Sequence, residues 1–441
     1  MEDGELRSVA PVERRHLLRD LGVASLAATA AVGLLRARPA RAATGTTGTV
    51  WDEGGAVFNV MAYGATGNGS TDDTSAIRAA ISAANSAKGG VVFFPQGNYL
   101  ISGQLSIPGS GIQLVGAGQN ATAITVSSSY ASGDVILFSN VSYGSVRMLS
   151  LTSQTARTGG AAIHMATANE IYVQDVDMAW QYVGCQIDGP CILNYIDRGY
   201  WTNFSAGGMG IWINTTGNDQ YISNIVMDNS PTLSNEPVAC LRIQATGAVW
   251  CHQCDMIHGQ NGLLIDPPSN SNVTWLFFSD CAWDTCGDRC ILISPGAGGS
   301  VRGVNFTNCW SSTALNYDGC YIGGAVDGVQ FVGHRFFNNA SNGLIAYGPA
   351  TNIFLDACGA AGNGGKFSGS QGIGFANSCS GFAVRNCRSG AYAGFGVSQA
   401  YGITVVGGCD NYILTGNNTQ GNSSAGINDG GGPTKVVANN L

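Results

Sequence analysis

A repeat of 22 to 30 residues runs through most of this 441-residue chain and constrains its fold more than any other feature. Each unit contains a Gly or Cys, a short apolar strand, a turn, a second short strand and a polar or Cys corner. The first strand starts at Gly210, Cys240, Gly262, Cys290, Cys320, Gly343 and Gly372. Repeats of this length indicate a solenoid, and short strands with no helices between them indicate a β-solenoid.

The end of the second strand has a marker of its own. It recurs at Cys254, Cys281, Cys309, His334, Cys358, Cys387 and, with one extra residue, Cys409. Coils of a solenoid stack about 4.8 Å apart, so equivalent side chains form columns. Small, weakly polar cysteines suit a narrow interior corner. We therefore predict that most of these cysteines are reduced core residues, with Cys281, Cys309, Cys358 and Cys387 in one column.

Two cysteine pairs are the exceptions that their spacing favours as disulfides. They are Cys185 with Cys191 and Cys251 with Cys254. Zinc at Cys251 and Cys254 is a third possibility, because His252 and His258 lie close in the sequence.

The first 42 residues have the features of a twin-arginine signal peptide. Arg14 and Arg15 precede a moderately apolar run from Leu21 to Leu35, and residues 40–42 fit a cleavage site. The run is too short and too weakly apolar to span a membrane. We expect a secreted or periplasmic protein in which residues 43–441 form one domain without a membrane attachment.

The composition of the remaining chain excludes some partners. After residue 42 it has 13 basic and 23 acidic residues, which disfavours nucleic acid binding. Glycine reaches 64 residues while Lys and Glu are scarce, a composition that favours short strands and turns over surface helices.

A helix is predicted near residues 73–86. Asp72 and Asp73 precede an apolar-periodic stretch that begins at Thr74. Carboxylates at this place cap free amides and complement the helix dipole, so we interpret the pair as structural. The helix should cover the exposed strand edges at the N-terminal end of the solenoid.

Two segments closely resemble the N-terminal part of the pectate-lyase-like superfamily, in proteins related to glycoside hydrolase family 28. They are residues 58–77, FNVMAYGATGNGSTDDTSAI, and residues 89–101, GGVVFFPQGNYLI. The resemblance implies an all-β fold, a right-handed parallel β-helix with a short N-terminal capping helix, in which residues 55–105 form the cap and first coil. It also implies an exported carbohydrate-active enzyme. Phage tail spikes and mannuronan epimerases share the segment, so it indicates the fold more than the reaction.

Candidate catalytic residues are mostly aspartates, because only Glu53, Glu170 and Glu236 follow residue 42. Acidic residues and tryptophans concentrate in the middle of the repeat: Asp255, Asp266, Asp280, Asp284, Asp288, Asp318, Trp250, Trp275, Trp283 and Trp310. Sugars bind to aromatic faces flanked by carboxylates and Arg, so this region is the predicted cleft for a polysaccharide or oligosaccharide.

One stretch of the cleft resembles a polygalacturonase signature. Residues 287–293, GDRCILI, are similar to G-D-D-C-I-A-I, in which two aspartates act on the glycosidic bond. The resemblance implies a catalytic Asp288, but Arg289 replaces the second aspartate. The family's G-H-G motif is absent, and Gly333-His334-Arg335 matches only part of it.

The spacing supplies a second carboxylate. Asp288 and Asp318 each lie two residues before a cysteine, and if Cys290 and Cys320 are equivalent the two carboxylates stack about 5 Å apart. That separation suits a retaining glycosidase, and repulsion would raise one pKa. The alternative is that both are turn residues bonded to local amides.

We therefore predict a glycoside hydrolase that uses Asp288 and Asp318, with no metal required. Further catalytic candidates are Asp255, Asp280 and Asp284. The predicted substrate-binding residues are Arg289, Trp283, Trp310, His258, His334, Arg335 and Tyr317.

Two other classes remain open. A polysaccharide lyase or epimerase acting on a uronate could use Arg289 as base and Ca²⁺ held by Asp284, Asp288 and Asp318. Arg335 and Arg388 each follow a corner position by one residue, so they should share a face that grips an acidic sugar. The third class is a non-catalytic glycan-binding module.

Overall fold

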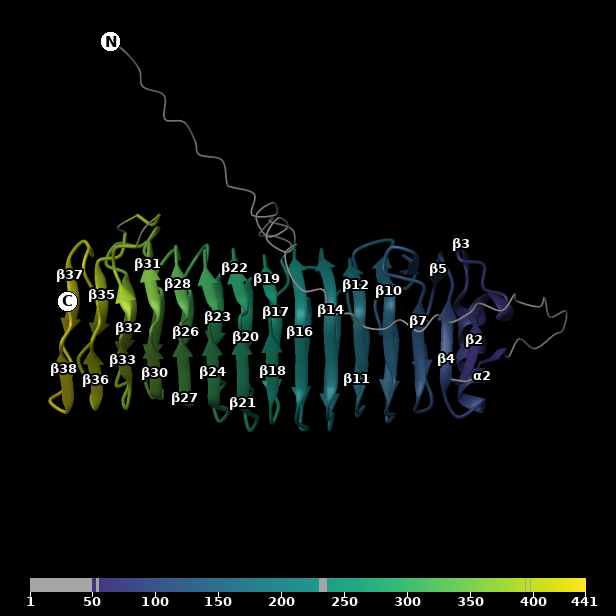
Figure 1. The fold of residues 1–441 in the computed structure, drawn as a ribbon, viewed down its shortest axis with the longest axis horizontal. Coiled ribbons are helices and arrows are strands. Elements are labelled where there is room, and N and C mark those ends of the chain that lie inside the picture. The colour runs from purple at the N-terminus through teal and green to yellow at the C-terminus, as the bar shows by residue number, and fades with distance from the viewer. Residues whose placement is uncertain (1–49, 53–54, 230–235, 393, 397) are drawn as a thin grey trace, which may run out of the picture. The chain divides into compact units, whose positions relative to one another are not determined.

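The structure, a computed structural model, describes residues 50–52, 55–229, 236–392, 394–396 and 398–441. The predicted signal peptide of residues 1–42 lies outside these ranges. The described chain forms a right-handed parallel β-helix, which confirms the predicted fold. Figure 1 shows its coils side by side from the purple N-terminal end to strand β38 at the yellow end.

Every coil contributes one strand to sheet B, which has 13 parallel strands among the described residues. In chain order these strands are β6 (Leu105–Ile107), β9 (Ile136–Ser139), β11 (Ala161–Ala166), β13 (Val183–Gly189), β15 (Met209–Thr215), β17 (Ala239–Ala245), β20 (Asn261–Ile265), β23 (Arg289–Ile293), β26 (Cys320–Ile322), β29 (Leu344–Tyr347), β32 (Gln371–Ala376), β35 (Tyr401–Val405) and β37 (Ala425–Asp429).

Sheet A covers the other two sides of each coil, and all its pairings are parallel except that of β1 with β2. Its strands are β1 (Val50–Asp52), β2 (Gly55–Asn59), β3 (Asn68–Asp72), β4 (Gly90–Phe94), β5 (Gly97–Ile101), β7 (Ile112–Gly116), β8 (Thr122–Val126), β10 (Ser145–Ser153), β12 (Tyr172–Ala179), β14 (Asn194–Thr202), β16 (Gln220–Asp228), β18 (Val249–His252), β19 (Asp255–Ile257), β21 (Asn272–Ser279), β22 (Ala282–Asp284), β24 (Ser300–Thr307), β25 (Trp310–Ser312), β27 (Val326–Val332), β28 (Arg335–Phe337), β30 (Thr351–Asp356), β31 (Gly359–Ala361), β33 (Ala383–Arg385), β34 (Arg388–Ser389), β36 (Tyr412–Thr415) and β38 (Lys435–Ala438).

A residue in the left-handed conformation bends sheet A once in each coil. The φ angle is 54° at Asp175, inside β12, and 55° at Asp280, between β21 and β22. Asn occupies several of these bends because its short polar side chain tolerates positive φ. The residue after the bend points into the core. These residues form one buried column, which we call the corner column: Cys254, Cys281, Cys309, His334, Cys358 and Cys387.

The cysteine prediction is confirmed, with two corrections. All 14 cysteines are free and buried, so the Cys185–Cys191 and Cys251–Cys254 disulfides are absent. Cys409 does not extend the corner column. On the coil that follows Cys387, the equivalent position is occupied by Asn417. Its side-chain oxygen accepts a hydrogen bond from the Cys387 amide.

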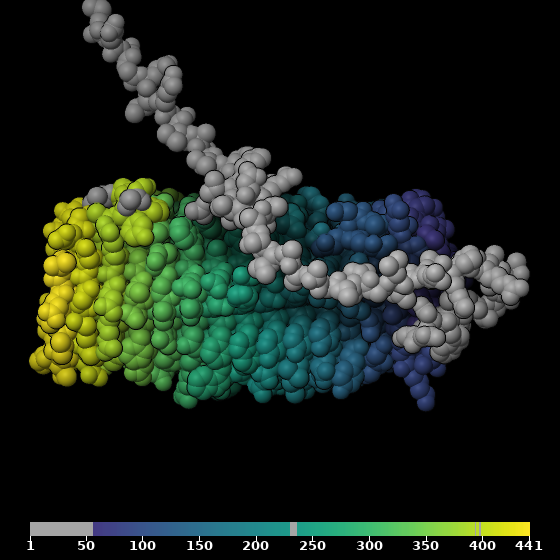
Figure 2. All heavy atoms as spheres, viewed as in Figure 1, coloured from purple at the N-terminus to yellow at the C-terminus, as the bar shows by residue number. Residues whose placement is uncertain are grey.

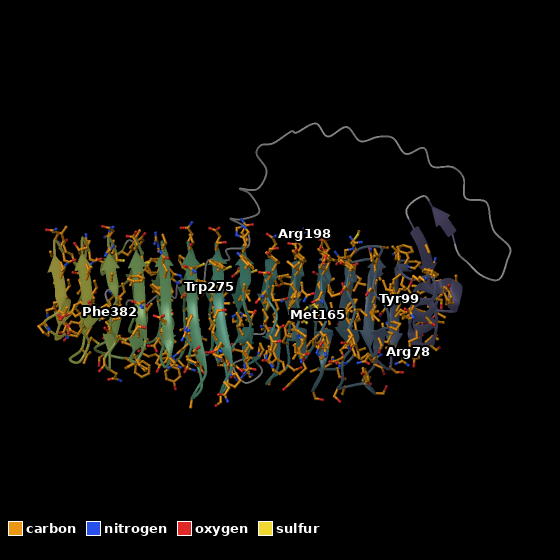
Figure 3. All side chains as sticks on the ribbon, turned by 90° about the horizontal axis from the view of Figure 1, so that it is seen from below. Arg78, Tyr99, Met165, Arg198, Trp275 and Phe382 are labelled. Carbon is orange, nitrogen blue, oxygen red and sulfur yellow. The ribbon has the colours of Figure 1, made fainter. Side chains whose placement is uncertain are left out.

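The core is continuous along the coils, because Ile, Val, Leu and Phe side chains repeat at the same register. Phe278, Phe306 and Phe331 stack with ring centroids 5.0 and 4.7 Å apart, close to the spacing of the strands. In Figure 2 the colour bands succeed one another along the long axis, as expected when each coil packs mainly on its two neighbours. Figure 3 marks Tyr99 and Phe382, both of which are buried.

The N-terminal end carries helix α2 (Thr74–Ser86), which confirms the predicted helix. The short 3-10 helix η1 (Val60–Tyr63), which was not predicted, precedes it. Ile77 and Ile81 of α2 are buried against the first strands. Asp72 accepts a hydrogen bond from the Thr74 amide, whereas Asp73 accepts from the amides of Thr66 and Gly67. Both aspartates are structural. No helix among the described residues has the length and apolarity to cross a membrane.

Candidate functional site

The candidate site lies where the loops that leave sheet A reach the start of sheet B. These loops are residues 258–260, 285–288, 313–319, 338–343 and 362–370, and we call them the loop edge. Backbone hydrogen bonds tie each loop to the next: the Gly287 amide donates to Gly259 and the Tyr317 amide donates to Asp288, at 2.8 and 3.1 Å. The ladder of the solenoid therefore continues through the loops and fixes their side chains relative to one another.

The predicted stacking of Asp288 on Asp318 is wrong by one residue. Ile291 pairs with Cys320, so Arg289, not Asp288, is level with Asp318. The position equivalent to Cys290 is Gly319, where a Cβ atom would lie 2.4 Å from the Asn339 side-chain nitrogen. Gly319, and not Cys320, therefore continues the column of Gly and Cys residues at the start of the strands of sheet B.

Asp318 is the ion-pair partner of Arg289. It is buried, accepts hydrogen bonds from the amide and side chain of Asn342, and receives the Arg289 Nε at 3.3 Å. The guanidinium lies over the rings of Tyr317 and Tyr321, 4.5 and 5.0 Å from their centroids. Both contacts are in the range of cation–π attraction, so Arg289 is held on three sides.

Asp288 belongs to a separate polar chain on the same edge. Asn316 donates to its Oδ1 at 3.4 Å, and the Lys366 ammonium donates to the Asn316 oxygen at 3.1 Å. The other carboxylate oxygen of Asp288 accepts no hydrogen bond from a described side chain, and Asn316 links Asp288 to Lys366.

Glu236 is the most unusual ionisable group near this edge. It is almost fully buried, and neither carboxyl oxygen accepts a hydrogen bond from any described residue. Burial, assisted by the negative charge of Asp288, raises the pKa of Glu236 to about 7. A carboxyl group in this condition is half protonated at neutral pH, and such groups concentrate at functional sites.

The outer face of sheet B continues the polar surface toward the N-terminal end. The column that includes Tyr321 also carries His164, Trp212 and Arg242. His164 lies between Asp134 and Asp188, 2.7 and 2.9 Å from their carboxylates. Burial alone would lower the pKa of His164, but the hydrogen bond and charge of Asp134, together with Asp188, raise it.

The other predicted acids are dispersed. Asp280 is exposed at the bend inside sheet A, 3.7 Å from His252, away from the loop edge. Asp255 lies on the second side of sheet A, in the column that continues through Trp310 and Arg335. Asp284 ends β22 beside Thr285. The predicted cluster of five aspartates therefore does not form one cleft.

Two predicted sugar-binding residues lie in the core. Trp283 is fully buried between Phe278 and Phe306. His334 is equally buried, and its Nε2 shares a hydrogen bond with the Ser311 hydroxyl at 2.7 Å. Burial lowers the pKa of His334 to about 3. Both predictions are wrong, because these side chains follow bends that turn them inward.

The remaining predicted contacts divide between two faces. Tyr317 lies on the loop edge and is well exposed, whereas His258, at the same edge, pairs with Asp228 at 3.2 Å. Trp310, Arg335 and Arg388 share a column on sheet A, which confirms that the two arginines have a common face. Arg335 donates to three backbone carbonyls there, a structural role.

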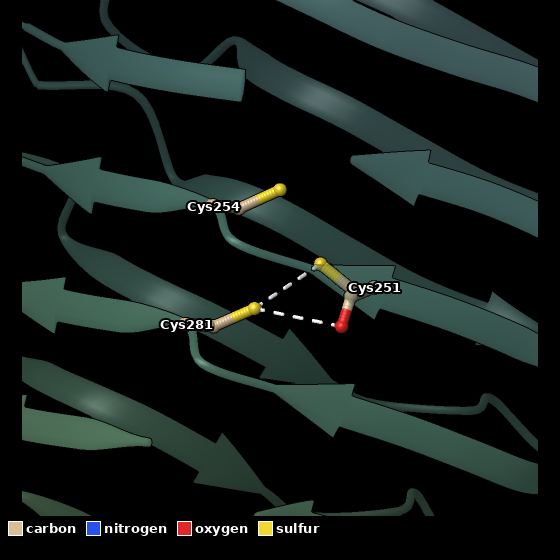
Figure 4. A group of neighbouring side chains, drawn as sticks. All are labelled: Cys251, Cys254 and Cys281. Atoms are coloured by element: carbon tan, nitrogen blue, oxygen red, sulfur yellow. Dashed lines mark hydrogen bonds between the residues drawn. The ribbon is translucent and has the colours of Figure 1, made fainter. Parts of the chain in front are cut away.

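A trio of thiols is the one group of three potential metal ligands in the described ranges. The sulfur atoms of Cys251, Cys254 and Cys281 all lie within 4.8 Å of one another (Figure 4). The zinc alternative lacks its histidines, because His252 bonds Ser279 at the surface and His258 pairs with Asp228. The predicted Ca²⁺ ligands Asp284, Asp288 and Asp318 likewise form no such group.

Glu236 was not among the site residues predicted from the sequence. Its rarity was a signal, since it is one of three glutamates after residue 42, but its burial beside Asp288 could not be deduced. Asn316, Tyr321, Asn342 and Lys366 were also missed, because their roles depend on the one-residue shift in register.

Comparison with known proteins gives a family model and several relatives. The model described as "Rhamnogalacturonase A/epimerase, pectate lyase-like" matches residues 57–264. Mannuronan C5-epimerase AlgE3 of Azotobacter vinelandii is 47% identical over 74 residues, which make up 15% of this chain and 4% of that protein. Rhamnogalacturonase A of Aspergillus aculeatus is 25% identical over 295 residues, 62% of each chain.

A solved structure extends the likeness along the solenoid. The A-module of mannuronan C-5 epimerase AlgE6 from Azotobacter vinelandii has a TM-score of 0.54 at 17% sequence identity, and the match covers 87% of this chain and 98% of that one. At this identity the likeness concerns the fold. The sequence matches span less than two thirds of either relative's length.

Proposed function

The chain belongs to the pectate-lyase-like β-helix proteins, and from this premise we propose that it hydrolyses a glycosidic bond in a uronate-containing polysaccharide. Its relatives by sequence and fold are carbohydrate-active proteins. The substrate would lie along the loop edge and the outer face of sheet B. Asp288 and Arg289 follow one another there, and Glu236 lies close enough to Asp288 to feel its charge.

The raised pKa of Glu236 carries the proposal. A glycosidase needs a carboxylic acid that is still protonated at working pH to donate to the leaving oxygen, paired with a carboxylate that is ionised. Burial and the charge of Asp288 raise the pKa of Glu236 to about 7, which suits that donor. Asp288 is then the partner carboxylate, acting as base or nucleophile at the anomeric carbon.

Arg289 supports a uronate as the sugar. Its Nε is taken by Asp318, but its two terminal nitrogens make no hydrogen bond to the described residues. A planar guanidinium with two free amino groups matches a carboxylate in a bidentate pair. Because guanidinium groups stay charged in proteins, Arg289 suits substrate binding better than the role of base. Lys366 adds a second cation on the same edge.

The activity would be exercised outside the cytoplasm. Arg14-Arg15, the apolar run that follows and the cleavage-site pattern at residues 40–42 support export by the twin-arginine route.

The test combines product analysis with one substitution. On a panel of polyuronates and rhamnogalacturonan, hydrolysis yields new reducing ends without an unsaturated sugar. Glu236→Gln should lower kcat/KM by about 10³-fold or more with the fold intact, and should remove the fall in kcat/KM above about pH 7.

Asp280→Asn is the matched control, since Asp280 is an exposed turn residue where Asn is equally suited to positive φ. It should leave the rate unchanged. A Glu236→Gln variant within a few-fold of the wild type would overturn the assignment of the acid.

A lyase or epimerase acting on a uronate is the second candidate. The 74-residue match to a mannuronan epimerase favours it, as does Arg289, which can neutralise the uronate carboxylate before a proton is removed from the adjacent carbon. Ultraviolet absorbance from a new double bond, or inverted uronate stereochemistry in NMR, would identify this chemistry in place of hydrolysis.

A further inference from the structure

An aromatic column runs along the outside of sheet A, on a different side from the loop edge. Tyr172, Tyr195, Tyr221, Trp250 and Phe277 occupy one register position on successive coils. Their ring centroids lie 4.7, 4.8, 5.0 and 5.5 Å apart, with interplanar angles of 1° to 17°. Inside the column each ring presents only its edge to solvent, because both faces are covered by neighbours.

The column stops abruptly at Tyr172. The next position toward the N-terminus is Ser145, and beyond it Gln113. These side chains are too small or too flexible to continue the stack, so the outer face of the Tyr172 ring borders a cavity of about 460 Å³. Tyr172 is 40% exposed.

The walls of this cavity have hydrogen-bonding capacity that the protein does not use. The Ser145 side chain is 3% exposed, and its hydroxyl has no partner among the described residues. The Arg147 Nε is likewise without a partner, while its guanidinium is anchored by Gln113. Glu170 adds an acceptor on the same wall. Buried polar groups without partners are costly, so their presence in a cavity points to a ligand.

We propose that the open face of Tyr172 and this cavity form a second glycan-binding site, in which a pyranose ring continues the aromatic column. One wall is a flat ring and the opposite wall is polar, with both donors and acceptors. A pyranose matches this arrangement, since it has an apolar C–H face and a rim of hydroxyl groups. A flat aromatic ligand would leave the polar wall unpaired.

The site has room for more than one sugar. A second cavity of about 340 Å³ shares Tyr172 and Gln174 with the first and continues past Asp197 and Arg198. A chain that starts on Tyr172 can therefore follow the ring edges of the column. The site needs none of the groups proposed for catalysis, and it would anchor a polymer while the loop edge acts on another part of it.

Saturation-transfer NMR on the full chain tests the proposal, with galactotriose and a galacturonate trimer as probes. All measurements use the Glu236→Gln background so that neither probe is consumed. Ring C–H protons of one sugar should receive the strongest saturation. Tyr172→Ala should weaken binding by about tenfold or more, whereas Tyr172→Phe should keep it.

Two further variants guard against misfolding. Ser145→Tyr adds a ring at the next register position and should block the site without removing any residue of the column. Phe277→Ala removes the ring at the other end of the column and should leave binding unchanged. Equal thermal unfolding temperatures confirm that the fold is retained.

Three results would overturn the proposal. The first is that the Tyr172→Ala variant and its parent bind galactotriose equally, or that neither binds it. The second is loss of galactotriose binding on Arg289→Ala, which would place the neutral sugar on the loop edge. The third is a preference for adenosine over both sugars.

Discussion

The corner column and the loop edge repeat with the same period, but they have opposite effects on the protonation of their ionisable groups. In the column, burial raises the pKa of Cys358 and lowers that of His334 to about 3, so both remain neutral at any working pH. At the loop edge, burial and Asp288 bring the pKa of Glu236 to about 7. A group that is kept neutral serves packing, and a group poised at neutral pH is available for proton transfer.

The two regions also differ in how their polar atoms are satisfied. The thiols of Cys281 and Cys309 each donate to the carbonyl two residues earlier, at 3.3 Å. Glu236 has no such partner among the described residues. A polar group that is buried without compensation costs stability, so its retention indicates a function other than folding.

The largest expected effect is on the pH dependence of stability. Because the pKa of Glu236 is raised from 4.5 to about 7 in the folded state, the folded chain holds a proton that the unfolded chain has released. The free energy of unfolding should therefore fall as pH rises from about 4.5 to about 7, by up to about 3 kcal/mol, and then level off.

Denaturant unfolding of the wild type and Glu236→Gln across this pH range measures the effect. The variant should lack that slope, and Asp280→Asn, which changes an exposed carboxylate, should retain it. Identical slopes in wild type and Glu236→Gln would contradict the contrast between the two regions.

A smaller effect is expected from the residues that hold the substrate. Arg289→Ala should raise KM for a polyuronate by about 10- to 100-fold, as expected for loss of a charge-assisted bidentate contact, with little change on a neutral glycan. Asp318→Asn keeps the shape but frees Arg289 to move, and should give a milder rise in KM. Steady-state kinetics of each variant on the polyuronate and on the neutral glycan measures these effects. A similar loss on the two glycans would indicate a general structural role for Arg289.

The smallest effects belong to the corner column. Cys281→Ser places a hydroxyl in an apolar corner and should cost about 1–2 kcal/mol of unfolding free energy without a change in kcat. His334→Cys replaces a fully buried ring that bonds Ser311 with a smaller side chain, and should cost about 2 kcal/mol, also without a change in kcat. Calorimetry and activity assays on both variants check this, and a large fall in kcat for either would show that the column contributes to the site.

The repeat was readable from sequence because solenoid packing is local. Each coil contacts mainly its neighbours, so a Cys or Gly at a corner has the same surroundings in every repeat, and the pattern of Cys281, Cys309, Cys358 and Cys387 predicts the column directly. The capping helix was equally predictable, since its apolar period and acidic start are local signals.

The site was not readable in the same way. Asp288 and Arg289 were identified from a signature, but their neighbours on the next coil depend on register. The sequence offers both Gly319 and Cys320 as the residue level with Cys290, and only the strand pairing shows that it is Gly319. Trp283 and His334 resemble sugar-binding residues by type, yet the backbone bends turn them into the core.

The β-helix and its column of reduced cysteines could thus be predicted from the repeat, and the cap from the local pattern of one helix. The pairing of Asp318 with Arg289 and the burial of Glu236 near Asp288 emerge only when the coils are stacked in their actual register. The physical reason is that a carboxyl group's pKa depends on the burial and charge around it, and these come from loops that are distant in the chain and have no repeat.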